Sequence, residues 1–219
     1  MGRNDWYREK TWGEKTKKAF FERLNRSRSS FHKAQYIRIQ ALYLRETGKK
    51  KYVRAALELL DLILEKWPHP FELAAAHLER AKCLEALGGW ATAIESYRES
   101  VQAERDNSGV KVCADLQFAW FVVRRRLSKY YDEALSAMME GDKDHLLIFP
   151  DYQFKFFSVI SIILDHRGRA EDSMRFAKRA LEAVAKKESP LRYHKKVGLV
   201  TNPDKAILKK LKRIAKRKC

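Results

Sequence analysis

Apolar residues recur every three to four positions along most of this sequence, the spacing that gathers them on one face of an α-helix. The recurrence begins after Thr11 and breaks at short polar, glycine-containing or proline-containing stretches. It predicts helices at about 12–25, 31–46, 52–66, 71–87, 90–105, 110–127, 132–139, 151–166 and 170–187. Only 196–200 is compatible with a short extended piece. The pattern therefore predicts an all-α protein.

The residues that flank these segments are typical of helix ends. Thr11 and Glu14 fit a capping box, and Ser30 is placed to cap the following helix. Asn202 and Pro203 predict the start of a final helix, with Asn as the cap and Pro in the first turn. All five prolines stand where predicted helices end, at Pro68, Pro70, Pro150, Pro190 and Pro203.

Small residues keep a constant position relative to the glycines that end several of these helices. Seven residues before Gly48, Gly88 and Gly168 stand Ala41, Ala81 and Ser161. The second helix of each pair carries its own small residue, at Ala55, Ala93, Ala134 and Ser173, which are 38, 41 and 39 residues apart. Antiparallel helices approach closely only where small side chains face each other. The spacing therefore predicts about four helical hairpins that bury their apolar faces by stacking on one another.

Two segments resemble the tetratricopeptide repeat family. LGGWATAIESYRESV at 87–101 has the glycine turn, the aromatic residue, Ala93, Tyr97 and the small Ser100, and HRGRAEDSMRFAKRALEAV at 166–184 follows the same plan. The units are longer than the family repeat of about 34 residues. The resemblance implies a right-handed superhelix of antiparallel hairpins over 31–187. It also implies a concave surface, lined by the first helices, that binds another macromolecule and performs no chemistry.

We therefore expect a single domain over 1–219. Residues 1–30 would form an N-terminal capping segment, and 188–219 a basic C-terminal capping helix. In that final helix, Ile207, Leu211 and Ile214 form an apolar stripe that would cover the last hairpin. The rest of the helix is basic, with Lys209, Lys210, Lys212, Arg213, Lys216 and Arg217.

The charge of the chain is concentrated at its two ends. The total is +18, of which 1–50 carries +9, 51–185 carries −2 and 186–219 carries +11. Outward lysines of the final helix would meet phosphate, an acidic protein or an anionic membrane. Tyr193 is the one aromatic residue near them, so sequence-specific reading of RNA bases is not predicted.

A second set of polar residues falls on the predicted first helices. Gln35, Arg38 and Arg45 share one helix face, and the predicted groove continues through Lys82, Arg125 and Lys155. Arginine and lysine along a groove hold carboxylates of an acidic or C-terminal peptide. The alternative is that these are ordinary solvated helix faces.

No pattern typical of an active site is present. The sequence has no phosphate-binding glycine loop, no paired histidines at metal spacing and no nucleophile elbow. We expect Cys83 and Cys113 to be buried thiols on apolar helix faces. We thus expect no catalysis, metal, cofactor or small-molecule substrate.

The cellular setting is predicted from cysteine number and hydropathy. An odd number of cysteines, together with the absence of any apolar run of about 18 residues, predicts a reduced cytoplasmic protein without a membrane span. The leading hypothesis is an adaptor or inhibitor with an acidic partner. The alternative is a nucleic-acid-associated protein that binds the phosphate backbone through its basic ends.

Overall fold

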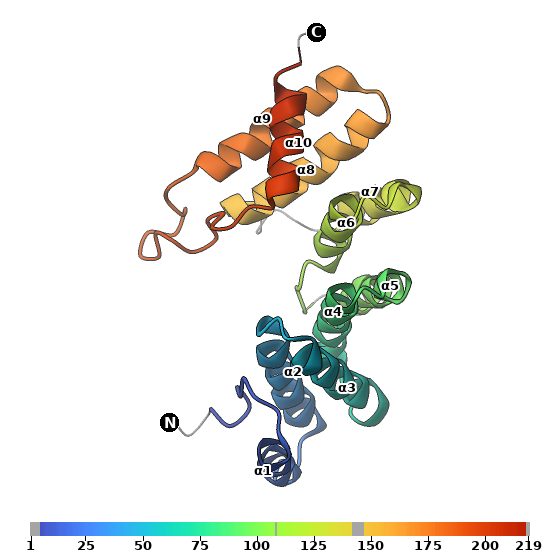
Figure 1. Cartoon of the computed structure of the whole chain (residues 1–219), viewed down its shortest axis with the longest axis vertical. Helices are drawn as coiled ribbons and strands as arrows, with labels where there is room; N and C mark the ends of the chain where they lie inside the picture. Colours follow the sequence, from blue (N-terminus) through green and yellow to red (C-terminus); the bar gives the residue numbers. More distant parts are fainter. Residues whose placement is uncertain (1–4, 108, 142–146, 218–219) are drawn as a thin grey trace. The chain divides into compact units, whose positions relative to one another are not determined.

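The computed structural model describes residues 5–107, 109–141 and 147–217, and the chain divides into two compact units (Figure 1). Unit 1 is Met1–Ala114 and unit 2 is Asp115–Cys219. Throughout the described residues the regular structure is helical, without a strand. The all-α prediction is therefore confirmed, while the interpretation of 1–219 as one repeat domain stays a prediction.

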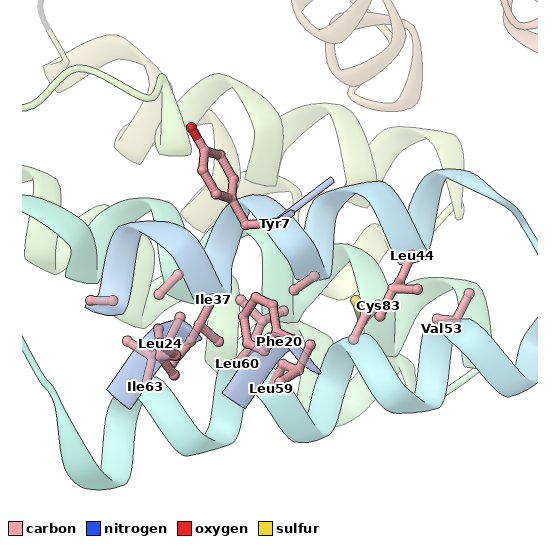
Figure 2. Close-up of a cluster of buried hydrophobic side chains, with 14 residues drawn as sticks. Tyr7, Phe20, Leu24, Ile37, Leu44, Val53, Leu59, Leu60, Ile63 and Cys83 are labelled. Carbon is pink, nitrogen blue, oxygen red and sulfur yellow. The ribbon is translucent and has the colours of Figure 1, made fainter. Parts of the chain in front are cut away.

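Unit 1 is built from helices that pack on their neighbours along the chain. α2 packs on α3, α3 on α4 and α4 on α5, and α2 also contacts α4 directly. The helices are α1 (Glu14–Asn25), α2 (Ser30–Glu46), α3 (Lys50–Lys66), α4 (Pro70–Leu87) and α5 (Trp90–Asp106). Figure 2 shows the core shared by α1, α2, α3 and α4, in which Phe20 of α1, Ile37 of α2 and Leu60 of α3 point toward one another.

Unit 2 repeats the packed-pair arrangement and adds a covering helix. α8 packs on α9, and α10 packs on both of them. The elements are α6 (Ala114–Arg124), the short 3-10 turn η1 (Ser128–Tyr130), α7 (Tyr131–Glu140), α8 (Pro150–His166), α9 (Ala170–Ala185) and α10 (Lys205–Ala215). The stripe of Ile207, Leu211 and Ile214 is buried. Within this unit, α10 therefore buries its apolar stripe against α8 and α9, while its role as the cap of a repeat stack stays a prediction.

Three predicted capping residues are wrong. α1 begins at Glu14 after Gly13, without a side-chain cap, so Thr11 and Glu14 form no capping box. α2 is capped by Ser29, whose hydroxyl oxygen accepts from the His32 N–H at 3.3 Å. α10 is capped by Asp204, whose carboxylate accepts from two N–H groups of the first turn, at 2.9 and 3.1 Å. The helix thus starts after Asp204 instead of after Asn202, and the Asp204 carboxylate also interacts favourably with the positive end of the helix dipole.

The predicted helix at 110–127 is shorter at both ends. Cys113 has a left-handed backbone (φ 57°), so α6 begins only at Ala114, and Cys113 is buried but lies off the helix. The Glu104 carboxylate accepts from the backbone N–H groups of residues 112, 113 and 114, at 3.0, 3.1 and 2.7 Å. Residues 196–198 form a turn and 199–200 have no regular structure, so the piece at 196–200 is not a strand.

Left-handed turn residues mark four helix ends. Gly48, Gly88 and Gly168 have φ of 68°, 87° and 73°, and Arg126 has φ of 57° after α6. Seven residues before each of these turns stands a small residue with no exposed surface, namely Ala41, Ala81, Ala119 and Ser161. Arg126 thus occupies the turn position that glycine holds elsewhere, and a small residue stands before all four turns.

The same counting corrects the predicted register of two second helices. The residues five positions after the left-handed turn residues are all buried, namely Val53, Ala93, Tyr131 and Ser173. The residues twelve positions after the same turn residues are buried as well, namely Leu60, Ser100, Met138 and Ala180. Ala55 is only partly buried, and Val53, two residues earlier, occupies the buried position that Ala93 and Ser173 hold in their pairs. Ala134 is fully buried, but it lies eight residues after Arg126, not five.

α8 and α9 make close contact through two serines. The Ser161 hydroxyl donates to the Ser173 carbonyl at 2.9 Å, and the Ser173 hydroxyl donates to the Ser161 carbonyl at 2.9 Å. Both side chains are fully buried. In the α4–α5 pair the equivalent positions are Ala81 and Ala93. A small side chain on each helix is what lets the two backbones approach this closely.

Candidate binding surfaces

Two partly buried ion pairs connect α2 to α4 in unit 1. Arg38 Nε lies 2.5 Å from Glu72 Oε2, and Arg45 Nε lies 2.7 Å from Glu79 Oε2. The two arginines are seven residues apart on α2, and the two glutamates are seven apart on α4. Seven residues are about two helical turns, so each set lies along one helix face and the pairs form successive rungs. We call this surface the α2–α4 face.

Lys82 adds a second cation to the second rung and is the third cation of the α2–α4 face. It lies nearly one turn beyond Glu79, and its Nζ is 2.9 Å from Glu79 Oε1. Burial by itself raises the pKa of Glu79, but Lys82 and Arg45 outweigh burial and hold that pKa below its usual value. Glu79 is therefore a stable carboxylate at neutral pH.

The two rungs satisfy charges that would otherwise be costly to bury. The Glu72 and Glu79 side chains are 5% and 10% exposed, whereas Arg38, Arg45 and Lys82 keep 22%, 22% and 26% of their side chains exposed. Removing one partner of such a pair leaves a charge in a dry environment. The rungs therefore hold α2 and α4 in register and leave the cationic side partly open to solvent.

The remaining predicted groove residues are divided between the two units. Gln35 is half-buried on α2, close to one turn before Arg38. Arg125 lies in the turn after α6, and Lys155 lies on α8, where its Nζ is 2.7 Å from Asp151. Arg125 and Lys155 belong to unit 2. The structure thus brings together Arg38, Arg45 and Lys82 within unit 1.

Sequence reasoning missed the acidic half of the α2–α4 face. Glu72 and Glu79 are seven residues apart, the same spacing as Arg38 and Arg45. That matched spacing was the available signal, since two helices in contact pair best when opposite charges repeat at the same interval.

An aromatic cluster lies at the start of α2 and α4. The Phe31 ring centroid is 5.1 Å from that of His69 and 6.5 Å from that of Phe71, and His32 stacks on Tyr36 at 6.1 Å. Phe71 is 56% exposed and directly precedes Glu72 of the first rung. The α2–α4 face therefore ends in an exposed apolar edge.

The basic C-terminal helix forms a separate candidate surface in unit 2. Its buried stripe faces α8 and α9, and Lys210 and Arg217 reach Asp165 of α8 at 3.6 and 2.6 Å. Burial lowers the pKa of Lys210, and Asp165 acts in the opposite direction. Of the predicted basic residues, the remaining four are exposed: Lys209, Lys212, Arg213 and Lys216.

Burial shifts the pKa values of Cys83 and His77, two side chains of unit 1. Burial raises the pKa of Cys83 to about 12, so this thiol stays protonated and unreactive. Burial also lowers the pKa of His77, whose Nδ1 lies 3.0 Å from Glu99 Oε2. Within the described ranges, no cluster of three His, Cys, Asp or Glu side chains is arranged to hold a metal ion. None of the helices described there has both the length and the apolar character needed to cross a bilayer.

Comparison of the chain with protein-family models, with curated proteins and with solved structures found no match.

Proposed function

We propose that this chain is a non-catalytic helical-repeat protein of tetratricopeptide-repeat type, an adaptor or inhibitor that binds an acidic segment of a partner protein. The observation that carries the proposal is the shared register of four helix ends. Each has a left-handed turn residue, a small buried residue seven positions before it and buried residues five and twelve positions after it. Such a unit buries its apolar faces against its neighbours, and stacks of these units present extended binding surfaces.

In this proposal the hairpins form a right-handed superhelix in the cytoplasm, and its concave surface includes the α2–α4 face. Three cations stand there against two buried carboxylates, so the exposed side of the face is positive. A guanidinium carries five N–H donors. Arg38 and Arg45 can therefore hold Glu72 and Glu79 through Nε and still donate to carboxylates of a bound segment.

The exposed aromatic edge defines the second feature of the partner. Phe71 and Phe31 lie beside the first rung and offer an apolar contact to a side chain of the bound segment. Interfaces gain most of their affinity from a few such anchors, while charges set orientation and association rate. The segment that fits is acidic, with one apolar or aromatic residue at the end that meets Phe71.

The test uses short fluorescein-labelled peptides rich in Glu with one Phe, and matched peptides in which every Glu is Gln. Fluorescence anisotropy on the full chain should show tighter binding of the acidic peptides, weakening as salt rises. Lys82→Gln should weaken binding about threefold to tenfold, up to ~1.4 kcal/mol. Lys50→Gln, at the exposed start of α3, is the matched control and should leave the affinity unchanged.

The first rung is tested by changing both partners together. Arg38→Gln alone leaves Glu72 charged and buried, so a loss of binding would be mixed with a loss of stability. Arg38→Gln/Glu72→Gln removes both charges and keeps groups that form hydrogen bonds. Equal affinity for the acidic and neutral peptides, or an acidic-peptide affinity unchanged in both Lys82→Gln and the double variant, would refute this assignment.

A further inference from the structure

The exposed side of α10 carries a stripe of like charges directly opposite its buried stripe. Lys205, Lys209, Lys212 and Lys216 follow one another at intervals of four, three and four residues, and all four are exposed. At about 100° per residue these positions lie within a narrow sector of the helix. Ile207, Leu211 and Ile214 occupy the other side and are buried against the rest of unit 2.

The lysine stripe is a net source of repulsion in the helix, and only Lys212 and Lys216, near the C-terminus of α10, gain from the helix dipole. Like charges three and four residues apart repel each other and destabilise a helix. Among the described residues, no carboxylate pairs with any of the four lysines. Asp165, the acidic residue that α10 does meet, takes Lys210 and Arg217 on the flank of the helix instead. The stripe therefore presents a row of positive charge that folding leaves without a counter-charge.

The segment that leads into α10 adds an exposed aromatic ring. Tyr193 is 80% exposed, and the Arg192 guanidinium lies 5.3 Å from its ring centroid. The segment is anchored at both ends: the Ser189 N–H donates to the Lys195 carbonyl at 2.8 Å, and the Asp151 N–H donates to the Gly198 carbonyl at 2.8 Å. Gly198 has φ of 74° and packs against Phe149, where a Cβ would collide with the ring. Tyr193 is thus displayed from a fixed turn.

We propose that unit 2 binds single-stranded nucleic acid, with the four lysines of α10 on backbone phosphates and Tyr193 stacked on a base. Proteins that bind single strands combine a track of positive charge with aromatic side chains on which bases stack, and every base offers a π-face. Because the lysines contact phosphate alone, this binding is independent of sequence. The proposal rests on unit 2 and does not depend on the peptide site proposed for unit 1.

Of two other partners for a positive surface, a membrane fits the structure less well and an acidic protein is separated by experiment. A helix that lies in a membrane surface inserts its apolar face into the lipid, whereas the apolar face of α10 is already buried against α8 and α9. An acidic protein would use the lysines and could also pack a side chain against Tyr193, so the test compares polyglutamate with the oligonucleotide.

The test measures anisotropy of a labelled mixed-sequence single-stranded oligonucleotide on the full chain over a range of salt. Four phosphate contacts predict a log–log salt slope of roughly −3. The variant Lys205→Gln/Lys209→Gln/Lys212→Gln/Lys216→Gln should bring that slope close to zero. Its control removes the same number of exposed lysines from the N-terminal region, as Lys10→Gln/Lys15→Gln/Lys17→Gln/Lys18→Gln, and should leave most of the slope in place.

The aromatic contact is tested at constant charge. Tyr193→Ala should weaken binding about tenfold with the salt slope unchanged, while Tyr193→Phe keeps the ring and should retain the affinity. Circular dichroism of each variant is the control for folding and should show the same helix content as the wild type.

Three results would overturn the proposal. The first is an equal effect of the two lysine variants, which would mean attraction to charge anywhere on the chain. The second is Tyr193→Ala binding as tightly as the wild type. The third is stronger binding to phosphatidylserine vesicles or to polyglutamate than to the oligonucleotide at the same salt.

Discussion

The reciprocal serine contact between α8 and α9 allows the close packing of a helix pair to be tested directly. We consider three changes: Ser161→Ala, Ser173→Ala and Ser173→Leu. Each alanine variant removes one hydroxyl that donates to a carbonyl of the other helix at 2.9 Å. The leucine variant places a large side chain where the backbones approach most closely and where serine has no exposed surface.

The sizes of the effects follow from these contacts. A buried neutral hydrogen bond contributes about 1 kcal/mol net, and alanine leaves a carbonyl that keeps its own helical N–H donor. Each alanine variant should therefore lose ~1 kcal/mol and the double variant up to ~2 kcal/mol, with any departure from the sum measuring the coupling of the two serines. Leucine should cost about 3 kcal/mol or more, because overpacking adds to the lost bond.

The measurement is urea unfolding followed by far-UV circular dichroism, with thermal melting beside it. For a chain of this length, 1 kcal/mol corresponds to about 2–4 °C in Tm. The Leu variant should thus melt well below both Ala variants. A Ser173→Leu protein as stable as Ser173→Ala would refute the close approach of α8 and α9, and with it the inference that small residues set the geometry of the pairs.

Three further predictions concern single residues. Lys82 and Arg45 hold the pKa of Glu79 below its usual 4.5 despite burial, so Glu79 stabilises the fold above that pH and its contribution is lost as the pH falls through the lower folded pKa. The difference in unfolding free energy between wild type and Glu79→Gln should accordingly shrink in acid, and a pH-independent difference would contradict the ion pairs. Cys83, with a pKa raised to about 12 by burial, should react slowly with iodoacetamide when folded and quickly in urea, as read by peptide mass spectrometry; rapid labelling of the folded chain would count against its burial. Arg126→Gly should raise the free energy of unfolding by about 0.5–1 kcal/mol by relieving a left-handed backbone, whereas Gly88→Ala should lower it by about as much or more. Urea unfolding measures both changes, and a loss of stability in Arg126→Gly or a gain in Gly88→Ala would show that the two turns differ.

Helix content and most helix positions could be predicted from the sequence, because they depend on local periodicity and on glycine and proline. The glycine at 88, for example, predicted both the end of α4 and the start of α5. The third turn was harder to place, since Arg126 takes a backbone conformation that sequence reasoning assigns to glycine. Ala119, seven residues before it, was the remaining clue.

The binding surfaces were less accessible to sequence reasoning because they depend on which helices touch. Arg38 and Arg45 were correctly placed on one face, but their partners lie 34 residues further along the chain, a pairing set by the packing of α2 on α4. The predicted helix-capping residues were wrong for a related reason. Ser29 and Ser30 are equally good candidates, and only the path of the chain decides which hydroxyl meets a free N–H. Partner contacts at these surfaces stay predictions.

The docking of α10 also bears on how long the chain survives in the presence of proteases. The helix is dense in peptide bonds that trypsin-like enzymes cut, but a protease needs an unfolded stretch of backbone, which a docked helix withholds. Cleavage of those bonds therefore requires Leu211 and the rest of the buried stripe to separate from α8 and α9. The Asp165 carboxylate, which pairs with Lys210 and Arg217, opposes that separation. Replacement of Asp165 on α8 should thus first increase proteolytic cleavage of the C-terminal segment.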